Sequence, residues 1–484
     1  MKSFLRRWLP LLAVVAVALG VRLAYYVGLR DFPLFNAPTG DTVEYASRAR
    51  AILAGDLLGG PGVYFHSSPA YPYFLAALAA LRGGDLQDLR LVALVQLLLS
   101  AGTAALVYLL GKKLLNSAAG GAVAGLLYAL SPVAVFYDGE LLMDFLLPPV
   151  LVGVALLATT RRWSLGRAAA AGALTAFGAL ARPSYLLLLL PVALAIWFGG
   201  EAAPRRQRLK WLGGLIVAAA LVVLPCTIRN YVVGRDLVLI SSNGGVNLFI
   251  GNNPQANGTF KAPGPWPAHL EASSTAYAED KAGRSLQPSA VSAFFTREAA
   301  RYAVTQPVDY LGKVGRRLRL LASAYEIPNH MDLEFFRARS GVLKLLPFTW
   351  GIVLPWALAG AFFAFRRRGS GPALGLAAVY LLSLATLFFV TGRYRFPAFA
   401  LLAAFAAAAV WGLVDAARRR VWWKLAVGAA VVATGYVASY AVPPPPEVVV
   451  SEAYSWHHLG GVYARRGDDR AAVRAYERAV TAEP

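Results

Sequence analysis

The amino-acid sequence predicts an all-α integral membrane protein with about eleven transmembrane helices. Three observations support this fold class: the composition, the length of the apolar runs, and the placement of the basic residues between them. Hydrophobic residues make up 57% of the chain and charged residues only 15%, whereas soluble domains carry roughly a quarter charged residues. Most of this chain therefore lacks the polar surface of a soluble protein.

Apolar runs of suitable length follow one another along the chain. A helix needs about 20 residues to cross a hydrocarbon core of about 30 Å. The runs that approach this length are residues 8–27, 89–110, 118–137, 141–160, 211–228, 346–365, 371–390, 396–414 and 422–442. Two shorter runs, 168–180 and 184–198, flank Arg182 and Pro183 and predict a helical hairpin. These runs together are the predicted spans.

The basic residues mark one side of the membrane. The formal net charge is +21, which taken alone would suggest a nucleic-acid partner. The lysines and arginines, however, cluster in alternate connections, at residues 2–7, 112–113, 161–167, 205–210, 366–368 and 418–424. Cytoplasmic connections of membrane proteins carry such an excess. We therefore predict a multi-pass protein with a cytoplasmic N-terminus, an external C-terminus and no nucleic-acid partner.

This topology divides the chain into four parts. Residues 1–228 form an N-terminal transmembrane module with a first outer loop at 28–88; residues 229–345 form an extracytoplasmic subdomain; residues 346–442 form the C-terminal transmembrane helices; and residues 447–484 lie outside. In the first loop we expect an amphipathic helix over 42–53 and a short helix after Pro72. The subdomain predicts a mixed structure, strand-like at 237–241, turn-rich over 242–258 and helical over 289–304 and 308–324.

The last part of the sequence carries a repeat signature after a stiff proline run at 443–446. The spacing is that of one tetratricopeptide unit of about 34 residues, through Trp456, Leu459, Gly460, Tyr463, Gly467, Ala472, Tyr476, Ala479 and Pro484. A single unit cannot bury its own apolar face. We therefore expect an incomplete array, whose missing neighbour comes from repeats beyond residue 484 or from a peptide or protein partner.

Acidic residues gather on the predicted outer face. Asp41 and Glu44 lie three positions apart in the first loop, so a helix would place both carboxylates on one side. Asp138 and Glu140 lie at the outer end of the third span. A single carboxylate in an outer loop is usually only solvated. The joint placement of these four favours a functional site.

Cationic side chains are predicted on the same face. His66 lies in the first loop, and Arg182, Arg393 and Arg395 occupy short outer connections. From Arg167 to Arg182 a helix rises only about 22 Å, less than the roughly 30 Å core, so Arg182 lies at or below the outer headgroups. A guanidinium at that depth needs a counter-ion, and a lipid phosphate suits its bidentate geometry. Otherwise these arginines would be interfacial anchors.

Several short segments carry a family resemblance in their order along residues 1–442. They are Arg22-Leu-Ala-Tyr-Tyr26, Gly40-Asp-Thr-Val-Glu-Tyr45, Pro69-Ala-Tyr-Pro72, Asp138-Gly-Glu140, Ala181-Arg-Pro183, Arg229-Asn-Tyr231, Ser242-Asn-Gly-Gly-Val-Asn-Leu248 and Gly251-Asn-Asn-Pro254. The ordered set resembles the GT-C superfamily of polytopic glycosyltransferases. It is most similar to bacterial relatives of the protein O-mannosyltransferases and lipid A aminoarabinose transferases, the glycosyltransferase family 39 type.

The resemblance implies a GT-C arrangement of helices and an inverting transfer of a sugar, hexose- or mannose-like, from a polyprenyl-phosphate donor to an acceptor hydroxyl outside the membrane. It implies that Asp41 is the general base, with Glu44 beside it, and that the second acidic site is Asp138 or Glu140. The residues implied for donor phosphate binding are His66, Arg182, Arg393 and Arg395. Those implied for the substrate pocket are Tyr45, Tyr71, Asn243 and Asn247.

The same resemblance sets expectations for cofactors and partners. A lipid-linked sugar already stores the energy for transfer, so no nucleotide or redox cofactor is expected. Mg²⁺ or Mn²⁺ at Asp41 and Asp138 stays possible, because carboxylate oxygens suit such ions. The family's lysine near the Pro-x-Tyr-Pro segment is absent, and His66 and Ser68 stand near its place. We expect a bacterial cytoplasmic-membrane enzyme with an external active site, acting within membrane lipid on a protein, glycan or lipid acceptor, with protein favoured by the tetratricopeptide unit.

Three other functions remain as alternatives. A transporter would carry ionisable residues near the middle of its spans and inverted repeats, and the sequence pattern indicates neither. A polysaccharide polymerase or ligase would be dominated by arginine and histidine rather than by paired carboxylates. A non-catalytic scaffold that presents the tetratricopeptide unit would leave the acidic residues without a role.

Overall fold

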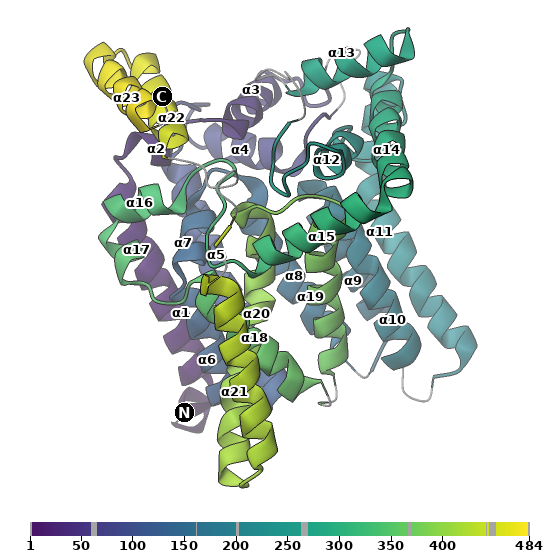
Figure 1. Cartoon of the computed structure of the whole chain (residues 1–484), viewed down its shortest axis with the longest axis vertical. Helices are drawn as coiled ribbons and strands as arrows, with labels where there is room; N and C mark the ends of the chain where they lie inside the picture. The colour runs from purple at the N-terminus through teal and green to yellow at the C-terminus, as the bar shows by residue number, and fades with distance from the viewer. Residues whose placement is uncertain are drawn as a thin grey trace.

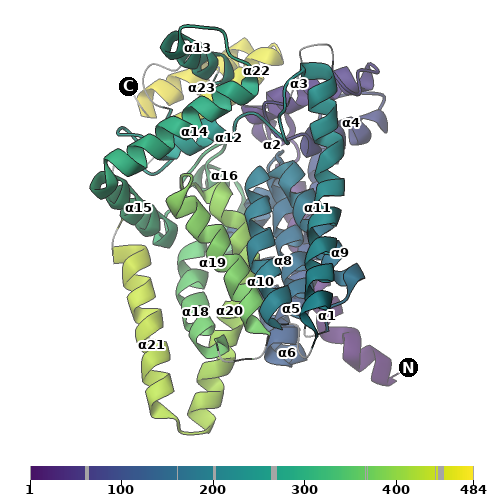
Figure 2. The same cartoon turned by 90° about the vertical axis from the view of Figure 1, so that its right-hand side faces the viewer.

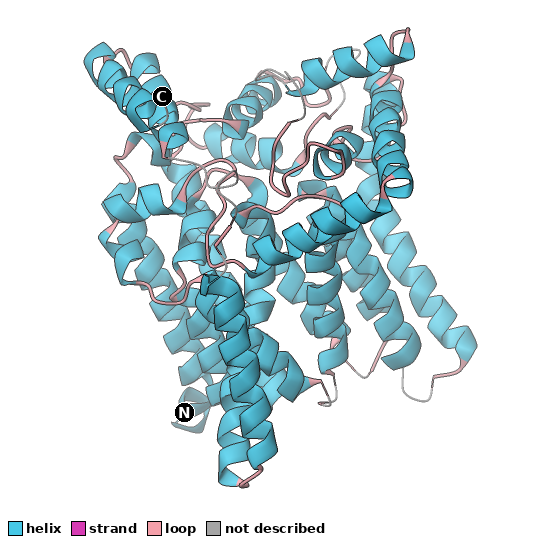
Figure 3. Ribbon diagram, viewed as in Figure 1, coloured by secondary structure: helices cyan, strands magenta, loops and turns pink. Residues whose placement is uncertain are grey.

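The computed structural model describes residues 2–59, 65–160, 162–199, 203–262, 270–365, 367, 369–441, 443–444 and 452–482. Every regular element in these ranges is a helix, and none is a strand (Figure 3). Long apolar helices run side by side, and mostly shorter helices cover one end of them (Figures 1 and 2). The predicted all-α, multi-pass membrane fold is thereby confirmed.

Each predicted span coincides with helical structure. The bundle consists of α1 (Lys2–Leu29), α5 (Arg90–Leu115), α6 (Ala118–Ala129), α7 (Pro132–Gly139), α8 (Leu147–Ala158), α9 (Leu165–Ala181), α10 (Leu189–Gly199), α11 (Arg205–Gly234), α18 (Trp350–Ala364), α19 (Ser370–Thr386), α20 (Gly392–Arg418) and α21 (Trp422–Tyr436). By length and composition, α1, α5, α11, α20 and the stretch Trp422–Ala441, which is α21 with the π-helical turn after it, can each cross a membrane. Helix α6 with α7 forms a further candidate bent by 57°. The remaining apolar helices are shorter, so the count of eleven spans stays a prediction.

Helix α20 lies at the centre of the bundle. In its most apolar window 78% of the residues are buried, against 17% for the peripheral α21. Its contact with α18 is close, because a Cβ added at Gly360 would overlap the carbonyl group of Phe405. Small residues at such contacts are how membrane helices pack, since lipid supplies no hydrophobic driving force between helices. The first turn of α20 carries Arg393 and Arg395 and lies where the bundle meets its covering layer.

The covering layer comes from two long segments between apolar helices, residues 30–89 and 235–349. The first supplies α2 (Pro33–Asn36), α3 (Asp41–Leu53) and α4 (Ala70–Ala80). The second supplies α12 (Gly244–Gly251), α13 (Leu270–Ala282), α14 (Pro288–Thr305), α15 (Pro307–Ala322), α16 (Leu333–Arg339) and α17 (Gly341–Leu345). The helices predicted at 42–53, after Pro72, at 289–304 and at 308–324 are confirmed.

The strand-like prediction at 237–241 is wrong. The Asn230 side chain donates hydrogen bonds to the carbonyl oxygens of Val238 and Ile240, each at 3.1 Å. Thr227 donates to the Leu239 carbonyl oxygen at 2.7 Å. Side chains of α11 therefore satisfy the backbone that a neighbouring strand would otherwise pair with, and the subdomain is helical rather than mixed in its described part.

The C-terminal residues form a helical hairpin of α22 (Ala453–Arg465) and α23 (Asp469–Ala482). A Cβ added at Gly460 would lie 2.7 Å from the Tyr476 ring, so the glycine lets the two helices approach. The hairpin lies in the covering layer, at the opposite end of the molecule from the start of α1 (Figure 1). Two helices are what the repeat spacing predicts, and the assignment to the tetratricopeptide family stays a prediction.

Candidate active site

Asp41 is the first residue of α3 and is presented by a tight turn. The preceding Gly40 has a φ of +48°, and a Cβ there would lie 2.7 Å from the His330 ring, so glycine alone fits this position. Nε2 of His330 lies 2.8 Å from the carbonyl oxygen of Thr39. This contact holds the turn in place, and the Asp41 side chain stays 51% exposed.

Arg393, in the first turn of α20, binds two carboxylates. Its Nη1 lies 2.7 Å from Oδ2 of Asp41, and its Nε lies 2.7 Å from Oδ2 of Asp144. Asp144 lies in a 3₁₀ turn, Met143–Leu146, between α7 and α8, and its side chain is fully buried. Arg182 binds the other Asp144 oxygen and donates to the Tyr380 hydroxyl at 3.0 Å. We call Asp41, Asp144, Arg182 and Arg393 the arginine–aspartate cluster.

The arginine–aspartate cluster joins four distant segments and balances its own charge. Two guanidinium groups face two carboxylates, which compensates charges that burial would otherwise penalise. Desolvation acts to raise the pKa of Asp41, but Arg393 and His330 outweigh it and hold that pKa below its usual value. Asp41 is therefore an ionised, partly exposed carboxylate that can accept a proton.

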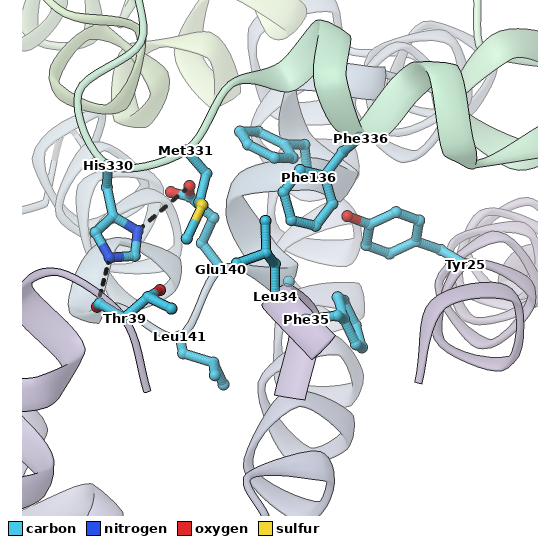
Figure 4. A pocket seen from close by; sticks show the side chains of 11 residues that line it. Tyr25, Leu34, Phe35, Thr39, Phe136, Glu140, Leu141, His330, Met331 and Phe336 are labelled. Atoms are coloured by element: carbon cyan, nitrogen blue, oxygen red, sulfur yellow. Dashed lines mark hydrogen bonds and ion pairs between the residues drawn. The ribbon is translucent and has the colours of Figure 1, made fainter. Parts of the chain in front are cut away.

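Glu140 and His330 form a second pair beside this cluster (Figure 4). His330 Nδ1 lies 3.7 Å from Glu140 Oε1. Burial acts to lower the pKa of His330, but the carboxylates of Glu140 and Asp41 raise it above its usual value. The pair borders a cavity of about 10 Å³, which suits one water molecule. Its other walls are mostly apolar: Tyr25, Leu34, Phe35, Phe136, Met331 and Phe336.

Asp138 lies apart from both groups, inside the bundle. Its carboxylate is 2.7 Å from Nη2 of Arg22 on α1, and both side chains are fully buried. Arg22 also donates to the Ser100 hydroxyl at 2.9 Å, and the Tyr128 hydroxyl donates to Asp138 at 3.4 Å. Because α7 ends between the two acids, the structure brings Glu140 to the site and leaves Asp138 in a closed ion pair.

Arg395 also points away from the site. It donates to Glu326 at 2.9 Å, and its side chain is fully buried against the Trp350 ring, 4.6 Å away. It further donates to the backbone oxygens of Leu320, Ser323 and Tyr325. Side chains two positions apart on a helix differ in direction by about 200°. Arg393 therefore reaches the arginine–aspartate cluster, whereas Arg395 binds residues 320–326 and holds them against α20.

The remaining first-loop candidates lie around α3. Glu44 accepts a hydrogen bond from the Ser67 hydroxyl at 2.6 Å, and desolvation raises its pKa. His66 Nδ1 lies 3.6 Å from Glu271 of α13. The buried rings of Tyr45 and Tyr71 meet edge to face at 5.4 Å beneath α3. Glu44 and His66 are thus held by Ser67 and Glu271, and the two tyrosines pack α3 against α4.

Asn243 and Asn247 lie at the start of α12. The backbone N–H of Asn243 donates to the His66 carbonyl oxygen at 3.3 Å, and the N–H of Asn247 donates to the Asn243 carbonyl oxygen at 3.0 Å. The Asn243 side chain accepts from the Ser241 hydroxyl at 3.1 Å. Asn243 therefore holds the start of α12 beside the His66 segment, whereas the Asn247 bond lies within the first turn of the helix.

Arg229, at the outer end of α11, has unused hydrogen-bond donors. Its guanidinium stacks 3.9 Å from the Phe65 ring centroid and donates to Asn230 at 2.9 Å. Its Nε and Nη2 atoms are buried and find no partner among the described residues. The guanidinium of Arg48 approaches from α3, since nitrogens of both arginines lie within 3.3 Å of the position that a Cβ on Gly59 would take. Two like charges therefore converge there.

The two aspartates considered for a shared metal do not meet. Asp41 binds Arg393 and Asp138 binds Arg22, in different parts of the molecule. Within the described ranges no group of three or more histidine, cysteine, aspartate or glutamate side chains could hold a metal ion. Asp41 and Asp138 thus do not fit a common Mg²⁺ or Mn²⁺ ion.

Solved structures of two membrane enzymes share features of this fold. The oligosaccharyltransferase of Archaeoglobus fulgidus, solved with a tethered acceptor peptide, matches with a TM-score of 0.51 and 15% identity, over 98% of this chain and 59% of that chain. This chain thus spans about three fifths of that enzyme's length. ArnT from Cupriavidus metallidurans, solved with undecaprenyl phosphate, gives a TM-score of 0.37 and 17% identity, over 84% of this chain and 79% of that chain.

A family model agrees with this fold. Residues 66–228 match the model described as dolichyl-phosphate-mannose-protein mannosyltransferase. The family model and the fold both agree with the resemblance to the GT-C superfamily that was drawn from the sequence. No curated protein matches the sequence.

Asp144, His330 and Arg229 are the site residues that sequence reasoning missed. Asp144 had a usable signal, because it is an acid within an otherwise apolar run, and such residues mark functional sites. Arg229 stood in a family-like segment without a role. His330 had no local signal, since only the fold brings it to Gly40.

Proposed function

We propose that this protein transfers a sugar from a polyprenyl-phosphate donor to an acceptor hydroxyl outside the membrane, with inversion, and that Asp41 is the general base. The observation that supports this most is the state of Asp41: ionised, half exposed and held by Arg393. The family matched by residues 66–228 is named for a dolichyl-phosphate-mannose donor and a protein acceptor. That name supports a lipid-linked donor and a protein hydroxyl.

The proposed step transfers one proton and exchanges one bond. The acceptor oxygen forms a bond to the anomeric carbon, and its proton passes to an Asp41 oxygen. The bond between the anomeric carbon and the phosphate oxygen breaks, and its electron pair leaves with the polyprenyl phosphate. Attack from the face opposite the leaving group inverts the anomeric centre. Arg393 keeps Asp41 ionised and in position before the step.

The donor phosphate needs cationic groups near the lipid. Arg182 and Arg393 are already paired with carboxylates of the arginine–aspartate cluster. Two guanidinium nitrogens of Arg229 have no partner in the described part of the chain, and the neighbouring α11 side chains Ile228, Tyr231 and Val232 are exposed. Such an exposed apolar surface suits the polyprenyl chain. We therefore assign the phosphate to Arg229 with His66, and charge stabilisation near the reacting carbon to Arg182 and Arg393.

The proposed location is a bacterial cytoplasmic membrane. The positively charged connections predict that the end of the bundle carrying the start of α1 faces the cytoplasm. The covering layer, with Asp41, would then face outside. An external site cannot draw on nucleotide-linked sugars, and this is consistent with a lipid-linked donor.

The test measures transfer with purified protein in detergent. A panel of short-chain polyprenyl-phosphate sugars is incubated with synthetic serine- and threonine-containing peptides, and products are read by mass spectrometry. Asp41→Asn should reduce turnover by roughly 10²–10⁴-fold while donor binding persists. Asp415→Asn, an exposed acid paired with Arg419 at the far end of α20, is the matched control. Turnover by Asp41→Asn within about threefold of the wild type would remove Asp41 from the role of base.

A further inference from the structure

The C-terminal hairpin binds the segment that directly precedes Asp41. Nη2 of Arg465 donates to the Pro38 carbonyl oxygen at 2.8 Å, and Nη2 of Arg466 donates to the Asn36 side chain at 2.5 Å. Both acceptors lie in or directly after α2, within five residues of Asp41. The hairpin is therefore fastened to the turn that presents the proposed base (Figure 1).

Helix α22, the first helix of the hairpin, also packs against α16, the helix that follows His330. The Trp456 ring meets the Phe335 ring of α16 edge to face at 5.2 Å. The guanidinium of Arg339 lies 4.7 Å from the Trp456 ring centroid, and that of Arg478 lies 4.6 Å from it. Because α16 directly follows the loop that carries His330, α22 bridges both segments of the candidate active site.

This docking brings two side chains of α22 beside the site. The His458 ring centroid lies 6.4 Å from that of His330, and Tyr454 stands edge-on to His458 at 4.3 Å. Burial and the charge of His330 lower the pKa of His458 to about 4, so its imidazole is neutral at neutral pH. Nε2 of His458 is buried and has no hydrogen-bond partner among the described residues, whereas Tyr454 is 44% exposed.

The hairpin and the proposed donor entrance lie on opposite sides of the covering layer. Helix α11, with Arg229 at its outer end, borders one side, and α22 and α23 border the other (Figures 1 and 2). A lipid-linked donor has to enter from the membrane, along α11. A water-soluble acceptor can then approach from the other side of the covering layer, next to the hairpin.

We propose that the hairpin forms one wall of the acceptor entrance, and that Tyr454 and His458 contact a polypeptide acceptor as its serine or threonine hydroxyl approaches Asp41. This inference rests on the proposed function and adds the specificity-determining residues. A neutral imidazole can donate to or accept from the amide groups of a peptide. A half-exposed tyrosine ring offers apolar contact with little loss of side-chain freedom.

The experiment separates acceptor binding from chemistry. The full chain in detergent receives a short-chain polyprenyl-phosphate sugar and the mixture of serine and threonine peptides. His458→Ala and Tyr454→Ala should each raise the peptide KM by about tenfold, the effect of losing one good contact. Donor hydrolysis without peptide and kcat at saturating peptide should stay within about twofold. His457→Ala, the neighbouring residue whose exposed ring faces Tyr476, should leave all three values unchanged.

A second variant tests the docking itself. Arg465→Ala combined with Arg466→Ala removes the bonds to Pro38 and Asn36, and should raise the peptide KM in the same direction without unfolding the membrane bundle. His458→Asn keeps a hydrogen-bonding side chain and should recover part of the affinity if His458→Ala folds poorly.

The outcomes distinguish this inference from the proposed function. Wild-type protein that neither hydrolyses the donor nor glycosylates any acceptor contradicts the proposed function itself. Wild-type turnover with an unchanged peptide KM in both alanine variants overturns the inference alone, as does an equal loss of donor hydrolysis and peptide transfer. Transfer to a glycan or a lipid but to no peptide overturns the assigned acceptor class.

Discussion

Asp144 offers the sharpest test of how the site is held together. It is fully buried and binds Arg182 and Arg393, whose side chains are 11% and 7% exposed. Asp144→Ala therefore leaves two buried guanidinium groups facing an empty position. Arg393 keeps Asp41 as a partner, but Arg182 keeps the Tyr380 hydroxyl and the Tyr394 ring and has no second carboxylate among the described residues.

The expected loss of stability follows from this count of partners. Removing one member of a buried ion pair typically costs about 3–5 kcal/mol, because the other charge stays buried without compensation. Since only Arg182 loses its sole carboxylate, we expect about 3 kcal/mol, near the lower end. A folded protein is stable by only about 5–15 kcal/mol, so the change is large. Activity should fall as well, because Arg393 then positions Asp41 less firmly.

The assay is reversible chemical unfolding of the purified protein in detergent, read by tryptophan fluorescence. Asp144→Ala is compared with Arg182→Met and with the double variant, in which both charges are gone. The double variant should be more stable than the sum of the two single losses predicts. Asp415→Ala, which breaks an exposed pair, should cost less than about 1 kcal/mol. Equal stability of Asp144→Ala and Asp415→Ala would refute the view that the cluster is a compensated, buried unit.

Three further predictions test neighbouring contacts. Gly40→Ala should lower turnover at least about tenfold with little loss of expression, because the positive φ and the close His330 ring leave no room for a Cβ; normal turnover would contradict this. The pKa of His330 is raised in the folded protein, so its contact with Glu140 contributes stability that is complete below about pH 6.5 and is lost as the pH rises through the folded-state pKa; the melting temperature should show this loss in the wild type and not in His330→Gln. Arg229→Ala should weaken binding of a short-chain polyprenyl phosphate more than Arg182→Ala does, and the reverse order would return the phosphate to Arg182.

Sequence reasoning predicted the parts of this protein that depend on local composition. Apolar runs predict helices because every backbone group must be paired within lipid, and each predicted run is helical. The covering helix that begins at Asp41 was predicted from its own amphipathic pattern. The strand at 237–241 was wrong because side chains of α11, remote from that pattern, bind its carbonyl oxygens.

The site was predicted only in part, since distance in sequence conceals its contacts. Asp41, Glu140, Arg182 and Arg393 were chosen for their side of the membrane, and all four lie in or beside the arginine–aspartate cluster. Asp138 met the same criterion, yet it is buried with Arg22. The side of the membrane does not determine the direction in which a side chain points. The pairing across 249 residues between Arg393 and Asp144 required the folded structure.

The first turn of α20 couples the site to the helical bundle. Arg393 fixes Asp41, and Arg395, two positions later, fixes residues 320–326, just ahead of the loop that carries His330. A tilt or a vertical shift of this central helix would therefore move Asp41 and its supporting loop together. Helices adjust their tilt when the hydrocarbon thickness changes, and the turn that presents Asp41 belongs to a layer outside the core. We therefore expect acyl-chain length to change how Asp41 is aligned with that loop, and reconstitution of the same protein in thin and thick bilayers tests this as a change in turnover.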